Sequence, residues 1–251
     1  MTASGLTLEQ KVLRLLSPTA TDQQALVTAL SDEDWHRIVA WAKEHRFAPL
    51  LHYMLFEVHK IQGVPVAIKN TLVQLRKKGV MRGLGAQREV LRISQILHAA
   101  GIDSMFLKGS YLGQFVYPAA GLRAIRDIDV LVAPTQVLRA QKVLLAGGLQ
   151  PHPKHPGDAD AALELGKHLP PMLSPSGVFP VELHERILPR ELVPEGGTDI
   201  SQGLSFWPNA IAKTVVDQQI NFASATELLF HLSVHSVYDH KFNNGPLIFS
   251  D

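Results

Sequence analysis

Hydrophobic residues recur at helical spacing through most of the first hundred residues. Between Ser31 and His45 they fall at positions i, i+3, i+4 and i+7: Trp35, Ile38, Val39 and Ala42. Ser31 followed three residues later by Asp34 is typical of a helix start, because each side chain can bond the backbone N–H of the other residue. The helical pattern continues over residues 47–59. The N-terminal part of the chain is therefore predicted to be helical.

One long helix is predicted over residues 65–100, where Pro65 suits the first turn. Because glycine weakens a helix interior, we expect a break or bend at its glycines, which are Gly79, Gly83 and Gly85. Glu89 is the only acid of the stretch, and its basic residues are Lys69, Arg76, Lys77, Lys78, Arg82, Arg88 and Arg92. They form either a solvated face or a surface that lies over a polyanion such as a triphosphate.

The pattern changes at Gly101, where short hydrophobic runs bounded by turn residues replace the helical spacing. Residues 102–107 and 128–132 are predicted to be buried strands. Helical spacing predicts one helix after the first strand, over residues 111–116, and another after the second strand, over residues 136–145. The order strand, helix, strand, helix favours an α/β fold.

Prolines, glycines and histidines between residues 151 and 180 predict loops, with a short strand around residues 161–165. A further strand is predicted over residues 179–187, and residues 209–238 are predicted to be mostly helical. We expect three regions: an N-terminal helical region (1–100), an α/β (α+β) core with a mixed sheet (101–190) and a mostly helical C-terminal region (191–251). The chain ends directly after a hydrophobic run, so we expect the polypeptide to continue beyond Asp251.

The composition narrows the class of protein. With 251 residues, 46% of them hydrophobic and 19% charged, the chain can bury a sizeable core. It has no cysteine, which excludes disulfides, thiolate metal sites and cysteine nucleophiles, so any metal ion has oxygen or imidazole ligands. The net charge of +1 gives no electrostatic argument for binding nucleic acid or a membrane surface.

No targeting or membrane-spanning segment is recognisable in the sequence. Glu9, Lys11 and Arg14 interrupt the N-terminal stretch, which therefore lacks the apolar core of a secretory signal. No segment approaches the roughly 18 consecutive apolar residues of a membrane span. We therefore expect a soluble, cytoplasmic protein.

Two short motifs carry the candidate chemistry. Asp127 and Asp129 alternate with hydrophobic residues on a predicted strand, so both carboxylates project from one face. Two neighbouring anions repel each other unless a cation binds, and paired carboxylates suit Mg²⁺. Upstream, Gly109 lets the backbone approach a phosphate, and Ser110 adds a hydroxyl at a helix start. The cations that can add positive charge for a triphosphate are Lys108 and Arg123.

Taken together, these motifs resemble the polymerase-β-type nucleotidyltransferase superfamily, and in particular its branch of largely uncharacterised bacterial nucleotidyltransferases. That branch has a Leu-Lys-Gly turn, an Arg shortly before Asp-Ile-Asp-(Leu/Val)-Leu-Val, and a later acidic-Leu-His strand. The corresponding segments here are Leu107-Lys108-Gly109, Arg123 before Asp127-Ile128-Asp129-Val130-Leu131-Val132, and Glu182-Leu183-His184. Lys167-His168-Leu169-Pro170-Pro171 resembles the loop that precedes the last of these strands, and the resemblance is specific over residues 95–190.

The resemblance implies transfer of a nucleoside monophosphate from a nucleoside triphosphate, ATP being favoured, to an acceptor. By this likeness Asp127, Asp129 and Glu182 are the catalytic residues and metal ligands, and hold two Mg²⁺ or Mn²⁺ ions about 3.5–4 Å apart. Glu182 can also take the proton of the acceptor hydroxyl. The implied nucleotide-binding residues are Lys108, Gly109, Ser110, Arg123 and His184. We expect a small molecule or a protein as the acceptor rather than a nucleic acid, and no membrane partner.

Other interpretations of the same residues stay open. The chain could be a catalytically inactive module of this fold that binds a nucleotide or a protein partner, because Glu182 stands where the branch often has Asp. The paired Asp residues could form a surface ion cluster with Arg123 and Arg126, and Lys108 could be an ordinary surface lysine.

The histidines also allow more than one interpretation. His168 and His184 suit either a structural role or a contact to phosphates or carboxylates. On the last predicted helix, His231 and His235 lie four residues apart with Asp239 one turn further, a spacing that can chelate a metal. That set would define a phosphohydrolase, whereas helix packing or a substrate contact would also explain the two helical histidines.

Overall fold

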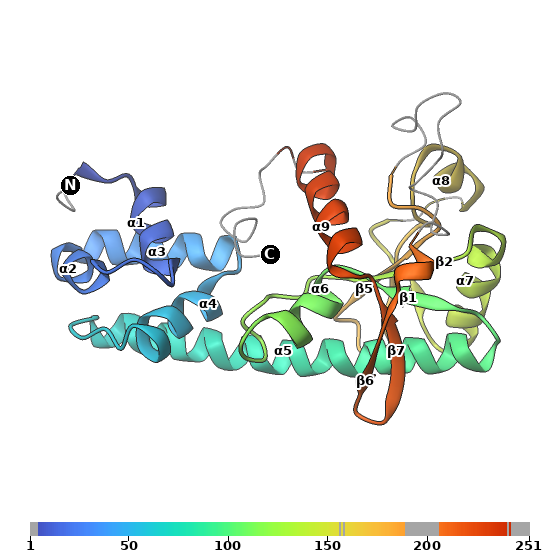
Figure 1. The fold of residues 1–251 in the computed structure, drawn as a ribbon, viewed down its shortest axis with the longest axis horizontal. Helices are drawn as coiled ribbons and strands as arrows, with labels where there is room; N and C mark the ends of the chain where they lie inside the picture. Colours follow the sequence, from blue (N-terminus) through green and yellow to red (C-terminus); the bar gives the residue numbers. More distant parts are fainter. Residues whose placement is uncertain (1–4, 156, 158, 189–205, 240, 242–251) are drawn as a thin grey trace. The chain divides into compact units, whose positions relative to one another are not determined.

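The structure is a computed structural model that describes residues 5–155, 157, 159–188, 206–239 and 241 (Figure 1). The chain divides into two compact units. The first comprises the described residues up to Leu84 together with Tyr117–Ala124, and the second comprises Gly85–Val116 and the described part of Ile125–Lys241. The region boundaries expected at residues 100 and 190 stay a prediction.

Helices build the first unit, as the hydrophobic spacing predicts. Before the long helix they are α1 (Leu8–Leu16), α2 (Gln23–Ala29), α3 (Asp32–Glu44), α4 (Ala48–Tyr53) and the π-helical turn η2 (Met54–Val58). Their hydrophobic faces form one core that contains Trp35 and Phe47. Helix α3 begins with the predicted reciprocal cap: Ser31 Oγ accepts a hydrogen bond from Asp34 N at 3.1 Å, and Asp34 Oδ2 accepts one from Ser31 N at 3.2 Å.

Helix α5 (Val66–Ala99) is continuous through its three glycines, so the predicted break does not occur. Two of these glycines are points of close approach. A Cβ at Gly79 would lie 2.6 Å from the carbonyl oxygen of Gly121, and a Cβ at Gly83 would lie 3.3 Å from the Gly121 nitrogen. Their small size therefore lets the segment Tyr117–Ala124 lie directly against the helix.

Seven strands form one mixed sheet in the described part of the second unit. Across the sheet they are β3 (Gln150–Pro151), β4 (Met172–Leu173), β5 (Pro180–His184), β2 (Ile128–Val132), β1 (Ser104–Phe106), β7 (Gln218–Phe222) and β6 (Ile211–Val215). The pairs β2–β5 and β1–β7 are parallel, and the other neighbouring pairs are antiparallel. The strands predicted over residues 102–107, 128–132 and 179–187 correspond to β1, β2 and β5, and the α/β class with helical flanks is confirmed.

Two segments differ from the sequence-based prediction. Residues 161–165, predicted to be a strand, lie in helix α8 (Ala159–Leu165), whose Ala, Leu and Glu residues are strong helix formers. Residues 211–222, predicted to be helical, form the hairpin β6–β7. Strand β7 pairs with β1 and buries Ile220 and Phe222 in the main core, so tertiary pairing decides the structure of this segment. The rest of the predicted helix is α9 (Ala225–Val234), continued by the π-helical turn η8 (His235–Asp239).

Hydrophobic residues cover both faces of the sheet. One face, with Phe106, Val130 and Leu183, packs in a core shared with residues of α5 and of α7 (Val137–Ala146). The other face carries Met105 and Leu131, which pack in a second core, and Phe230 of α9 packs against that core. The remaining helical segments are α6 (Gly109–Tyr111), η3 (Leu112–Val116), η4 (Pro134–Gln136) and η7 (Trp207–Asn209).

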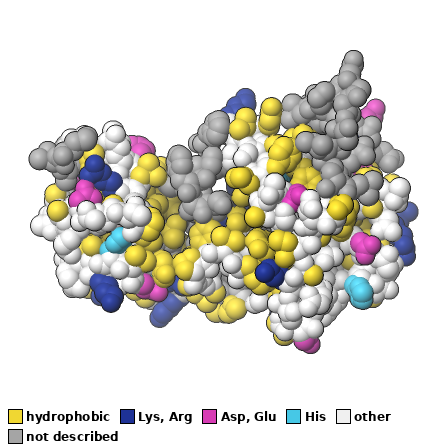
Figure 2. Space-filling view, viewed as in Figure 1, with side chains coloured by type: hydrophobic (Ala, Val, Ile, Leu, Met, Phe, Trp, Pro, Cys, Tyr) yellow, Lys and Arg dark blue, Asp and Glu magenta, His cyan; other side chains and the backbone are white. Residues whose placement is uncertain are grey.

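Helix α9 and the turn after it also carry hydrophobic residues at the surface. The exposed ones are Leu229, Val237 and Tyr238, and Figure 2 shows hydrophobic side chains over this part of the molecule. None of the described helices combines the length and hydrophobicity that crossing a membrane requires.

Candidate functional site

Strands β2 and β5 are parallel neighbours, and each carries one carboxylate that lies beside that of the other strand. The register pairs Asp129 with Glu182, and His184 lies two residues further along β5. Because side chains alternate along a strand, Val130 and Leu183 point into the core shared with α5 and α7, and the three polar residues project from the opposite face. The hydrophobic residues that flank each polar position fix this register, since a slip by one residue would bury the carboxylates in the apolar core.

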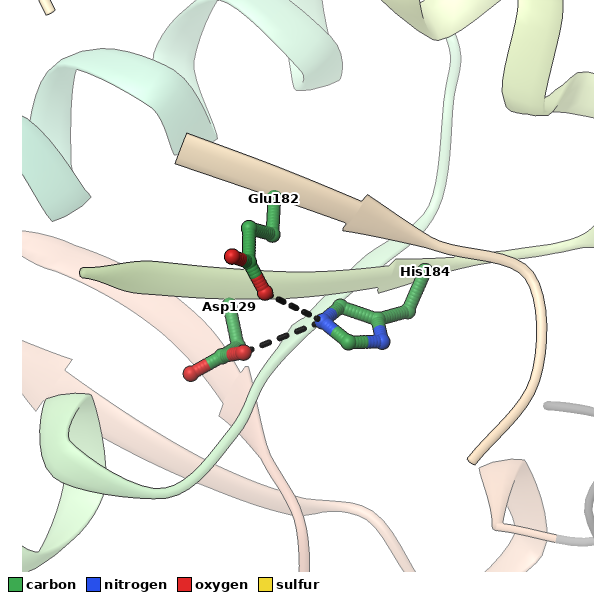
Figure 3. Close-up of side chains that lie close together, drawn as sticks. All are labelled: Asp129, Glu182 and His184. Atoms are coloured by element: carbon green, nitrogen blue, oxygen red, sulfur yellow. Dashed lines mark hydrogen bonds and ion pairs between the residues drawn. The ribbon is translucent and has the colours of Figure 1, made fainter. Parts of the chain in front are cut away.

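His184 joins the two carboxylates (Figure 3). Its Nε2 donates a hydrogen bond to Asp129 Oδ1 at 3.0 Å and lies 3.6 Å from Glu182 Oε2. One ligand atom from each of the three residues lies within 4.8 Å of the other two. This group can therefore hold a metal ion.

Lys108 reaches the same carboxylate from the end of β1. Its Nζ donates to Asp129 Oδ1 at 2.9 Å, and both side chains are buried. The Lys108 backbone has φ +44° and ψ −119°, a region that residues with a side chain seldom adopt and that costs of order 1–3 kcal/mol. The interpretations as a surface lysine and as a surface ion cluster are wrong for Lys108 and Asp129, because the two form a buried ion pair.

The charges of this cluster shift the pKa of each member. Burial raises the pKa of Asp129, but the Lys108 ammonium and the hydrogen bond from His184 outweigh it and hold that pKa well below its usual range. Burial and the charge of Asp129 raise the pKa of Asp127. Burial lowers the pKa of Lys108 and of His184, yet the neighbouring carboxylates raise both above their ordinary values. For Glu182 the nearby His184 outweighs burial and lowers the pKa. The face thus holds the carboxylates of Asp129 and Glu182 opposite the Lys108 ammonium and the His184 imidazole, whose pKa they raise.

The other residues predicted for the site lie at different places. Asp127 directly precedes β2, half-buried and outside the converging group, although its charge acts on Lys108. Gly109 and Ser110 are buried at the start of α6, and Ser110 Oγ makes no hydrogen bond within the described part of the chain. Arg123 belongs to the first unit and donates to the Ala124 carbonyl oxygen at 2.6 Å. The roles of these residues in catalysis and nucleotide binding stay predictions.

Two further histidines lie beside His184. His168 has its ring centroid 5.1 Å from that of His184 and its Nε2 3.8 Å from Glu182 Oε2. His231 of α9 is buried, 6.2 Å from His184 between ring centroids, and burial lowers its pKa well below the usual range. Sequence reasoning grouped His231 with His235 and did not connect it with the carboxylates, because no local signal reveals that α9 packs on this face.

The phosphohydrolase interpretation needs a metal held by the C-terminal helix. The rings of His231 and His235 lie 6.3 Å apart between centroids. The third member, the Asp239 side chain, lies outside what the structure describes. That interpretation therefore stays a prediction.

Comparison with known proteins identifies the class. The chain belongs to the family described as uncharacterised nucleotidyltransferase, whose model matches residues 31–251. The class of reaction is therefore nucleotidyl transfer. No curated protein and no solved structure matches the chain.

A divalent cation, which nucleotidyltransferases typically use, fits the residues on this face. Asp129 and Glu182 offer carboxylate oxygens, the ligands that Mg²⁺ and Mn²⁺ prefer. Burial is the main cause of the raised pKa of Asp127, and repulsion from the charges of Asp129 and Glu182 raises it further. A bound cation would relieve this repulsion.

Proposed function

We propose that this protein transfers a nucleoside monophosphate from a nucleoside triphosphate, with ATP as the favoured donor, to a hydroxyl group of a small molecule or a protein in the cytoplasm. The observation that carries the proposal is the convergence of Asp129, Glu182 and Lys108 on one face of the sheet. The family supplies the class of reaction, and the resemblance of the motifs to the polymerase-β-type superfamily supports the mechanism.

In this proposal Asp129 and Glu182 hold Mg²⁺ or Mn²⁺, with Asp127 beside them. When bound, the ion neutralises charge on the triphosphate and lowers the pKa of the acceptor hydroxyl. Lys108 keeps Asp129 ionised and fixes its carboxylate. The Ser110 hydroxyl, which is buried and makes no hydrogen bond within the described residues, offers one to a phosphate oxygen. Further nucleotide contacts proposed from the motifs come from Gly109, Arg123 and His184.

Glu182 is the base in this proposal. Its side chain keeps 22% of its surface exposed, whereas Asp129 keeps 1%, so a substrate can reach Glu182. The acceptor oxygen forms a bond to the α-phosphorus while the bond to pyrophosphate breaks, and the acceptor proton passes to Glu182. His184 and His168, at 3.6 Å and 3.8 Å from Glu182 Oε2, flank the carboxylate that receives this proton.

Calorimetric titration tests the proposal. Non-hydrolysable ATP and GTP analogues are titrated with and without Mg²⁺ into the wild type, Asp129→Asn, and Asp103→Asn as the matched exposed control. Wild type and the control should bind an analogue when the ion is present, and Asp129→Asn should not, although a thermal melt shows it folded. Absence of binding by the wild type with Mg²⁺ would contradict the proposal. Metal-dependent binding without transfer to any acceptor in a screen would favour the inactive nucleotide-binding module.

A further inference from the structure

Two neighbouring imidazoles behind the carboxylates have ring nitrogens without a hydrogen-bond partner among the described residues. These atoms are Nδ1 of His184 and both Nδ1 and Nε2 of His231. Their side chains are almost inaccessible, with 0% and 1% exposed. Native proteins pair nearly all buried polar groups, because leaving one without a hydrogen bond is costly. The nitrogens therefore point to a hydrogen-bonding function for this pair of rings.

The two nitrogens of His184 have different surroundings. Nε2 faces the carboxylates of Asp129 and Glu182, and Figure 3 shows the second ring nitrogen on the side turned away from them. The His231 ring lies 6.2 Å from the His184 ring between centroids, at an interplanar angle of 71°. At this separation the two rings make no direct hydrogen bond to each other. The distance between them is compatible with a single bridging water.

We propose that His231 is a positioning residue of the carboxylate site: it is the water-bridged partner of His184 Nδ1 and thereby keeps Nε2–H directed at Asp129. The two nitrogens of an imidazole are linked, because the hydrogen bond made by one determines which proton form the other presents. An imidazole offers one N–H donor and one acceptor nitrogen, so His231 can complete the bridge in either direction. Partners of this kind behind a metal site orient the residues that hold the ion.

This role extends the site beyond the α/β core expected at residues 101–190. Two residues separate helix α9 from strand β7, which pairs in parallel with β1, the strand that leads into Lys108. His231 lies on the buried side of α9 together with Leu228 and Val234. The C-terminal part of the chain therefore takes part in the site through this helix.

The test replaces His231 by Phe, which keeps an aromatic ring of similar shape but has no nitrogen. Histidine-labelled, metal-free and nucleotide-free protein is observed by ¹⁵N NMR, whose imidazole signals report which ring nitrogen of His184 carries a proton. At a pH above the pKa of His184, where the ring is neutral, we expect a single form with Nε2 protonated in the wild type and a mixture of forms in His231→Phe. His231→Asn or His231→Gln, which restore a polar atom near Nδ1 or Nε2, should recover the single form.

Metal affinity supplies the second readout. Mn²⁺ titrated calorimetrically without nucleotide should bind His231→Phe about tenfold more weakly or worse. His235→Phe, in the π-helical turn that continues α9, is the matched control and should change neither readout. If His184 keeps its wild-type signals in His231→Phe, or if His235→Phe has the same effect, the proposal is wrong. Should the Phe variant not fold, His231→Met takes its place as the variant without a nitrogen.

The role of His231 rests on the proposed function in one respect, because both take this face of the sheet as the functional site. The NMR readout needs neither a nucleotide nor nucleotidyl transfer, so the role of His231 and the proposed function can fail separately. Wild-type His184 signals in His231→Phe overturn the role of His231 and leave nucleotide binding untouched. Failure of the wild type to bind a nucleotide analogue overturns the proposed function and leaves the His231–His184 relationship testable.

Discussion

Lys108 Nζ lies 2.9 Å from Asp129 Oδ1, although 21 positions separate the two residues along the chain. The strained Lys108 backbone turns the chain at the end of β1, and the adjacent strand β2 carries Asp129 in antiparallel pairing. A buried carboxylate with such a partner stays ionised at neutral pH, as the lowered pKa of Asp129 indicates. The ion pair thus maintains negative charge where the proposed function needs a metal ligand.

Removing the Lys108 ammonium should destabilise the protein. Lys108→Met leaves Asp129 as a buried charge with one hydrogen-bond partner fewer, and breaking buried pairs costs about 3–5 kcal/mol. We expect the free energy of unfolding to fall by an amount near the lower end of this range, because the hydrogen bond from His184 to Asp129 remains. Urea unfolding measures the loss, with Lys142→Met on the exposed side of α7 as the control. Equal stability of the two variants would show that the ion pair does not stabilise the fold.

The contribution of His184 should depend on pH. Although burial lowers the pKa of His184, its hydrogen bond to Asp129 and its proximity to Glu182 raise it overall. A raised pKa means that the stabilisation is complete below the unfolded value of about 6.5 and is lost as pH rises through the folded value. His184→Gln keeps an amide donor without the charge, so the free energy of unfolding should differ more between wild type and variant at pH 6 than at pH 9. Urea unfolding at both pH values measures this difference. A difference in unfolding free energy between wild type and His184→Gln that is equal or larger at pH 9 would contradict the prediction.

Gly121 should not tolerate a side chain. A Cβ there would lie 2.4 Å from the Gly79 carbonyl carbon of α5, and the Gly121 φ of +72° adds backbone strain. Gly63 has a similar φ of +80°, and nothing lies within 4 Å of a Cβ built there. Gly63→Ala therefore measures the cost of the backbone strain without the steric clash. We expect Gly63→Ala to cost about 1 kcal/mol and Gly121→Ala about 2 kcal/mol more. Thermal melts measure both, and similar melting temperatures would mean that the close approach is unimportant.

Two buried serines should respond in opposite ways to the loss of their hydroxyls. Ser94 Oγ accepts a hydrogen bond from Gln218 Nε2 at 2.8 Å, so Ser94→Ala should cost about 1 kcal/mol in urea unfolding. Ser110→Ala should leave stability unchanged or slightly higher, because its hydroxyl makes no hydrogen bond within the described residues. Under the proposed function only Ser110→Ala weakens metal-dependent binding of an ATP analogue, measured by calorimetry. Unchanged affinity in that variant would remove Ser110 from the nucleotide site.

Local signals predicted the elements that carry most of the candidate site. The cap of Ser31 and Asp34 marks the start of α3, and hydrophobic runs predict β2 and β5. These features depend on neighbouring residues, which is why the sequence reveals them. The same reasoning failed for the hairpin at residues 211–222, since its pairing with β1 comes from a distant part of the chain.

The sequence by itself determined the α/β class and the segments in which Asp129, Glu182 and Lys108 occur, because hydrophobic periodicity and short motifs are local properties. Only the tertiary structure decided that Lys108 is an ion-pair partner of Asp129, that His184 joins the two carboxylates, and that His231 lies against His184. These contacts depend on strand order, parallel register and the packing of α9. Such long-range hydrogen bonds and burial have no counterpart in the spacing of residues along the chain.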